Sequence, residues 1–206
     1  MTSFISFAEP MKLILTKIIA SPDIHSKWLN TLSYLENCGA KKIAACEHPT
    51  LVKEEVLKHA SEEFRHAHYL KRQIERVSQK PLKSYSLPHL IGGFSTLHYL
   101  AKLDLKTSRY LKEAGFTRKD IKEAAYLLVT YAIERRATEL YPLYEEALRK
   151  TSLRVTVKSI LLEEEGHLAE MEEGLRLLPS GSLHASRICA IESALCQKWL
   201  EALEAL

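Results

Sequence analysis

The feature that most constrains this chain is a pair of short motifs, each a glutamate followed three residues later by a histidine. Glu63 and His66 form the first motif, and Glu164 and His167 form the second. Residues three apart lie on one face of a helix, so each motif can present a carboxylate and an imidazole to one metal ion. We expect both motifs to lie on helices. The function depends on whether the helical turns that carry the two motifs face each other.

The spacing of two further glutamates is more specific than the motifs, because a chain with 26 acidic residues and 9 histidines contains such a motif by chance. Glu36 precedes Glu63 by 27 residues, and Glu134 precedes Glu164 by 30. If a short loop joins each pair of helices, the partners lie roughly 20 Å from the turn at about 1.5 Å per residue. The spacing therefore predicts two antiparallel hairpins that carry their acids at similar depth.

Apolar residues recur at helical spacing over most of the chain, and glycine and proline number only seven each. The pattern predicts an all-α protein. Ser21 before Pro22, and Thr117 with Asp120, are typical helix starts, and Gly115 is typical of a helix end. The expected helices are a short N-terminal one, four long ones at about 22–45, 50–77, 117–150 and 153–178, a shorter one at about 94–113, and a last one at about 182–206.

Composition excludes several function classes. The formal net charge is +3, with no basic cluster that would indicate nucleic-acid binding. The four cysteines show no CxxC spacing, which argues against a zinc ribbon or a disulfide scaffold and favours a reducing, cytoplasmic setting. The apolar N-terminal segment is interrupted by Lys12 and Lys17 and is too short to span a membrane. We expect one domain over residues 1–206, with the last helix on the bundle or on a partner chain.

The order of Glu36, a first ExxH, a long crossover, Glu134 and a second ExxH resembles the ferritin-like di-iron carboxylate superfamily over about residues 21–178. The resemblance implies a ferritin-like four-helix bundle whose crossover carries the extra helix at 94–113, with an additional C-terminal helix at about 182–206. It also implies six metal ligands, which are Glu36, Glu63, His66, Glu134, Glu164 and His167.

The resemblance further implies that Glu63 and Glu164 bridge two metal ions. Four carboxylates balance the charge of two divalent ions, and oxygen ligands with one imidazole per ion suit two irons, or manganese in one or both places. The remaining ligands would divide into two pairs, Glu36 with His66 and Glu134 with His167.

Three more residues occupy positions with a role in the family. Glu62 and Glu163 directly precede the two motifs, where relatives often carry an aspartate that hydrogen-bonds a ligand histidine. The alternative for each glutamate is a solvated side chain. Thr138 lies one turn after Glu134, where several di-iron monooxygenases carry a threonine that faces the oxygen pocket. The alternative is a threonine bonded to its own helix, near a kink at Pro142.

Other side chains near the motifs have simpler interpretations. His59 lies one turn before Glu63, and we expect a partly exposed helix histidine rather than a group that supports the metal site. Tyr131 and Tyr141 are expected to pack in the core rather than line a substrate pocket. Leu70 stands where a tyrosyl-radical subunit would carry a tyrosine, which argues against that role.

The resemblance implies an O2-activating oxidase or hydroxylase that takes electrons from an external donor. The substrate would be a small molecule or a modified nucleoside, since tRNA hydroxylases of this superfamily have similar size. The alternative is an iron-handling ferroxidase or a peroxide-scavenging protein like ferritin or rubrerythrin, although the rubredoxin module with CxxC pairs is absent. A third possibility is a non-enzymatic bundle with an acidic core. A homodimer formed through the last helix is compatible with the first two.

Overall fold

The computed structural model describes residues 4–48 and 50–205. Within that part, all regular structure is helical, which confirms the predicted all-α class. The α-helices are α1 (Ala8–Ala20), α2 (Pro22–Ala44), α3 (Glu54–Gln73), α4 (Gly93–Glu113), α5 (Arg118–Arg149), α6 (Lys158–Leu177) and α7 (Gly181–Glu204), with short 3-10 turns η1 (Ile74–Arg76) and η2 (Leu87–His89).

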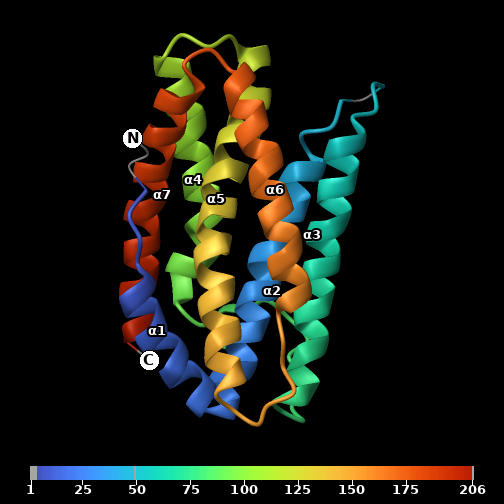
Figure 1. Ribbon diagram of the computed structural model, residues 1–206, viewed down its shortest axis with the longest axis vertical. Helices are drawn as coiled ribbons and strands as arrows, with labels where there is room; N and C mark the ends of the chain where they lie inside the picture. Colours follow the sequence, from blue (N-terminus) through green and yellow to red (C-terminus); the bar gives the residue numbers. More distant parts are fainter. Residues whose placement is uncertain (1–3, 49, 206) are drawn as a thin grey trace.

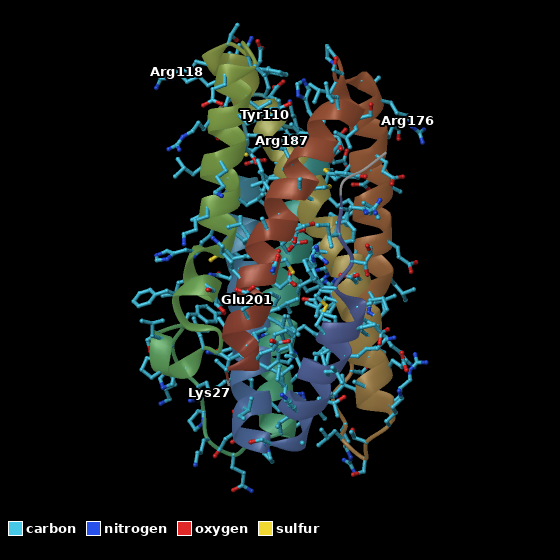
Figure 2. The ribbon with its side chains drawn as sticks, turned by 90° about the vertical axis from the view of Figure 1, so that its left-hand side faces the viewer. Lys27, Tyr110, Arg118, Arg176, Arg187 and Glu201 are labelled. Atoms are coloured by element: carbon cyan, nitrogen blue, oxygen red, sulfur yellow. The ribbon has the colours of Figure 1, made fainter. Side chains whose placement is uncertain are left out.

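Two antiparallel hairpins, α2–α3 and α5–α6, form the body of the molecule (Figure 1). The crossover between them contains η2 and α4, and α4 packs against α5. Helix α7 packs along α4 and α5, so its apolar stripe is covered within the chain itself. Figure 2 shows α7 across the front of the molecule, with its charged Arg187 and Glu201 on the outer surface.

Local sequence sets the helix ends where the pattern predicted them. The Ser21 hydroxyl accepts the amide of Ile24, with Pro22 as the first helical residue of α2. The Thr117 hydroxyl accepts the Asp120 amide at the start of α5. Gly115 has a φ of +87°, the left-handed conformation that closes α4 and that glycine adopts without strain.

Two helix starts differ from the prediction. Helix α3 begins at Glu54 rather than near Thr50, and α6 begins at Lys158 rather than near Leu153. The second difference has a visible cause, because a buried Glu145 oxygen accepts the Val157 amide at 2.9 Å and the Thr156 hydroxyl at 3.0 Å. These bonds hold a β-branched segment that favours extended backbone. Helix α5, by contrast, continues through Pro142.

The main buried cluster takes apolar side chains from all seven α-helices, which ties α1 and α7 to the two hairpins. Trp28 of α2 stacks on Trp199 of α7 with ring centroids 5.7 Å apart. Both tryptophans are therefore buried packing residues. In the described part of the chain, no helix has both the length and the apolar character needed to cross a bilayer. Representative core residues are Met11, Trp28, Leu70, Leu103, Leu128, Ile160 and Ile188.

Candidate metal centre

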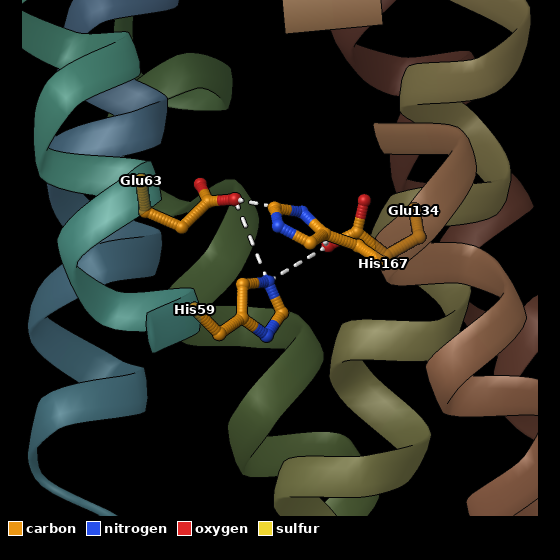
Figure 3. Close-up of side chains that lie close together, drawn as sticks. All are labelled: His59, Glu63, Glu134 and His167. Atoms are coloured by element: carbon orange, nitrogen blue, oxygen red, sulfur yellow. Dashed lines mark hydrogen bonds and ion pairs between the residues drawn. The ribbon is translucent and has the colours of Figure 1, made fainter. Parts of the chain in front are cut away.

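The six side chains singled out by spacing come together between the two hairpins. Their ligating atoms fall into two groups, and within each group all of them lie within 4.8 Å of one another. One group contains Glu36, Glu63, His66 and Glu164. The other contains Glu63, Glu134 and His167, together with His59 (Figure 3). Glu63 belongs to both groups, and all seven side chains are buried except Glu36, which is partly buried.

The distances within each group suit coordination. In the first group, His66 Nδ1 lies 3.1 Å from Glu164 Oε1 and 3.8 Å from Glu63 Oε1. In the second, His167 Nδ1 lies 3.6 Å from the same Glu63 oxygen and 3.7 Å from Glu134 Oε1. Two ligand atoms about 2.1 Å from one ion lie about 3.0 Å apart at a right angle and about 3.4 Å apart at a tetrahedral angle. These buried groups can therefore hold a metal ion.

Several atoms that face the interior of the cluster lack a hydrogen-bond partner. Among the described residues, this is true of His66 Nδ1, His167 Nδ1, Glu134 Oε2 and Glu164 Oε1. Leaving a polar atom buried and unpaired costs about 1–3 kcal/mol, so native proteins rarely do so. Four such atoms, from three helices, belong to the Glu–His cluster, so the cluster has ligand atoms that a metal ion could use.

The outward-facing nitrogen of each motif histidine contacts a glutamate from the opposite hairpin. Glu163 on α6 lies 2.9 Å from His66 Nε2, and Glu62 on α3 lies 2.9 Å from His167 Nε2. An imidazole that donates Nε2–H outward keeps its Nδ1 lone pair directed into the cluster. Arg65 also pairs with Glu163. The expected carboxylate–histidine contacts are therefore present, although both glutamates are also partly solvated.

Burial changes the protonation of the cluster. It raises the pKa of Glu63 to about 8, with repulsion from Glu164 adding to the effect. Burial also raises the pKa of Glu36, Glu134 and Glu164 well above the usual carboxyl range. It lowers the pKa of the three imidazoles, to about 3 for His66 and about 4 for His59. The metal-free cluster thus holds protons that a divalent ion would displace.

An apolar cavity of about 70 Å³ reaches the cluster from the side of α7. Glu36, Glu63 and Tyr141 line it where it meets the ligands, and the Tyr141 hydroxyl donates to Glu36 Oε1. Tyr141 is therefore both a buried core residue and a contact of the site. The remaining lining residues are Leu32, Leu35, Gly39, Tyr99, Leu100, Ile133, Arg136, Ala137, Leu140 and Trp199.

Thr138 is bonded to its own helix rather than directed at the cavity. Its hydroxyl donates to the Arg135 carbonyl oxygen of its own helix at 3.1 Å. Ala137, one residue earlier, lines the cavity, whereas Thr138 is not among the described residues that do so. This geometry gives Thr138 no contact with the cavity beside the ligands.

The expectation for His59 was wrong. Its side chain is 1% exposed, and its Nε2 lies 3.2 Å from Glu134 Oε1 and 3.5 Å from Glu63 Oε1. The sequence carried a signal for this position, because residues 59, 63 and 66 follow the i, i+4, i+7 spacing of one helix face. Tyr126, whose hydroxyl lies 3.3 Å from His59 Nδ1, had no sequence signal.

Comparison of the chain with protein-family models, with curated proteins and with solved structures finds no match. The site therefore rests on the residues of this chain and on their geometry.

Proposed function

We propose that this protein is an O2-activating oxidoreductase of the ferritin-like di-iron type, an oxidase or hydroxylase of a small, largely apolar molecule. The observation that carries the proposal is the buried set of Glu and His atoms drawn from α2, α3, α5 and α6, four of which have no hydrogen-bond partner among the described residues. The order of these ligands along the chain and their grouping in space agree with the four-helix ligand pattern of that superfamily.

The grouping supports two ions rather than one. Glu63 Oε1 lies within reach of both groups, as a bridging carboxylate would. Four carboxylates then neutralise two divalent ions in an interior that would otherwise reject four negative charges. Carboxylates combined with imidazole suit iron, with manganese next. When bound, a reduced ion pair of this kind supplies the electrons and the binding site for O2 activation.

The chain's own residues orient the ligands and exclude water. Glu62 and Glu163 fix the ring positions and tautomers of the two motif histidines, which raises the basicity of each inward nitrogen. Tyr141 occupies Glu36 Oε1 and leaves Oε2, which lies 3.9 Å from His66 Nδ1, free to face the ion. The protons that the buried carboxyl groups hold in the metal-free state leave when the ions enter.

The cavity favours an organic substrate over iron handling. A path for hydrated Fe²⁺ would present oxygen ligands along its length. Here the walls beyond the ligands consist mainly of leucine, isoleucine, alanine and aromatic carbon. At about 70 Å³ the space suits O2 and a few apolar atoms of a substrate, since pockets that enclose a whole ligand measure about 300–1,000 Å³. Electrons for repeated turnover would come from an external donor.

The test is an anaerobic Fe(II) titration of metal-free protein, followed by O2. We expect about two irons per chain, a near-ultraviolet absorption band after O2 addition and O2 uptake in proportion to the bound Fe(II), which is the only reductant present. Glu164→Ala and His167→Ala should each lose iron at one position and lose O2 consumption. Glu165→Ala, which alters an exposed neighbour, is the matched control. If both ligand variants keep two irons, the assignment fails.

The same titration separates the alternative function. A ferroxidase or storage protein would oxidise many irons per chain and would form a large assembly in size-exclusion chromatography. A peroxide scavenger would consume peroxide faster than O2. A monomer or homodimer that oxidises only about two irons per chain would favour the oxidase or hydroxylase.

A further inference from the structure

His59 stands between the two hairpins with the orientation of a ligand. Its ring comes from α3, and Nε2 points at the carboxylates of Glu63 and Glu134 at 3.5 and 3.2 Å (Figure 3). The ring also lies against His167, with centroids 4.1 Å apart. Nitrogen and oxygen atoms at these distances fit around one ion about as well as those of the motif histidines do.

Each of the three imidazoles has one ring nitrogen near an outer oxygen and the other near the carboxyl groups of the cluster. Within the described residues, only His59 has a hydrogen-bond partner on the inner side, Glu134 Oε1 at 3.2 Å, which a bound ion would replace. For His66 and His167 the outer partners are acids. For His59 it is the Tyr126 hydroxyl, 3.3 Å from Nδ1. With Nδ1–H donated to Tyr126, Nε2 keeps its lone pair for a metal.

His25 shows what a buried structural histidine looks like in this fold. It is fully buried, and its Nε2 contacts the Tyr144 hydroxyl. Its other nitrogen, Nδ1, has no hydrogen-bond partner among the described residues, and His25 belongs to neither ligand group. In His59, Nδ1 lies near the Tyr126 hydroxyl and Nε2 lies near the carboxyl groups of Glu63 and Glu134. In His25, the nitrogen that does not contact a tyrosine has no such neighbours in the described part of the chain.

We propose that His59 is a third imidazole ligand and that it makes the two metal positions chemically unequal. The position formed by His59, His167, Glu63 and Glu134 has two nitrogens, whereas the position formed by Glu36, Glu63, His66 and Glu164 has one. Imidazole favours iron over manganese more strongly than carboxylate does. The nitrogen-rich position therefore fills with iron first, and the carboxylate-rich position is the one that admits manganese.

This inference rests on the metal centre of the proposed function but does not require its oxygen chemistry. The first test is an anaerobic calorimetric titration of metal-free protein with Fe(II). Wild type should show two resolved binding steps. His59→Gln should weaken one step by more than about a hundredfold, beyond the ten- to hundredfold loss typical of a residue that only orients a ligand, and leave the other step unchanged. The control His25→Gln should titrate like wild type.

The second test uses wild type alone and so does not depend on a variant that folds. One equivalent of Cu(II), which follows nitrogen ligands most strongly, should give an electron paramagnetic resonance spectrum with coupling to two imidazole nitrogens. Coupling to a single imidazole nitrogen would overturn the proposal, as would two unchanged Fe(II) steps in folded His59→Gln.

The outcomes separate this inference from the function beneath it. Wild type that binds no metal overturns both. Wild type that binds two irons regardless of His59 overturns the third ligand alone. Unequal binding that depends on His59, without any O2 consumption, sustains the third ligand and removes the oxidase or hydroxylase.

Discussion

Two clusters of buried charge lie in this molecule, and they are built in opposite ways. Around Arg136, the guanidinium donates to both oxygens of Glu192, at 2.9 and 2.8 Å, to the Ile5 carbonyl oxygen and to Glu139. Tyr99 donates to the same Glu192 carboxylate. Each charge in this cluster is met by protein. In the Glu–His cluster, four atoms have no hydrogen-bond partner among the described residues, and two of them, His66 Nδ1 and Glu164 Oε1, lie 3.1 Å from each other.

The difference separates a structural role from a binding role. The Arg136 cluster joins α5 to α7 and to the segment before α1, and it needs no further component. The Glu–His cluster brings together four carboxyl groups, and within the described residues their ion-pair partners are histidines alone. Burial alone therefore says little about function. What distinguishes the two places is whether the protein itself satisfies its buried groups.

The largest effect is expected where the structural cluster is broken. Arg136→Met leaves Glu192 buried without its partner, and this should lower the free energy of unfolding by about 3–5 kcal/mol. Urea denaturation should give a similar loss for the metal-free and Fe(II)-loaded protein. The neighbouring Arg135→Met, partly exposed over Phe4, should cost much less. A loss confined to the metal-loaded form would show that the two clusters are not independent.

A smaller effect is expected in the Glu–His cluster of the metal-free protein, where a substitution should raise the free energy of unfolding rather than lower it. Because burial raises the pKa of Glu63 to about 8, folding favours its neutral form, and its destabilising effect grows as pH rises above the unfolded value of 4.5. Metal-free wild type should therefore lose stability between pH 6.5 and 8. Glu63→Gln should remove part of that slope, on the order of 1–2 kcal/mol across the window.

Urea denaturation at several pH values measures this slope, with the exposed Glu165→Gln as control. Fe(II) should reverse the trend in wild type, because the ions bind the deprotonated carboxylates. Identical pH profiles for wild type and Glu63→Gln would mean that Glu63 ionises in the metal-free fold as freely as it does in water.

The smallest effect is expected at Thr138, which belongs to neither cluster. Thr138→Val removes one bond to the Arg135 carbonyl oxygen, and it should cost no more than about 1 kcal/mol and leave iron loading unchanged. Ala137 precedes Thr138 and lines the cavity. Ala137→Val should narrow the cavity and so change O2 consumption at equal iron content. If Thr138→Val changes turnover and Ala137→Val does not, then Thr138 rather than Ala137 contacts the reacting molecule, and the assignment of Ala137 to the cavity wall that matters is wrong.

Much of the site followed from the sequence because helical geometry is regular. Glu36 and Glu134 could be placed at the depth of the motifs from residue counts alone, since rise per residue and antiparallel pairing fix that depth. His59 was misjudged although it shares a helix face with Glu63 and His66, because the depth of its burial depends on how closely α3 packs against the other hairpin. The late start of α6 depends on Glu145, an acid in another helix whose hydrogen bonds compete with helix formation.

The crosswise pairing of Glu62 with His167 and of Glu163 with His66 has a consequence for assembly. Each motif histidine is oriented by an acid that belongs to the other half of the chain, and the bridging position needs both halves as well. An isolated hairpin would thus carry ligands with unfixed rings and little affinity. If the proposed metal centre forms, tight metal capture would be a late event in folding, and a protein that opens between its hairpins would release its metal before it loses its helices.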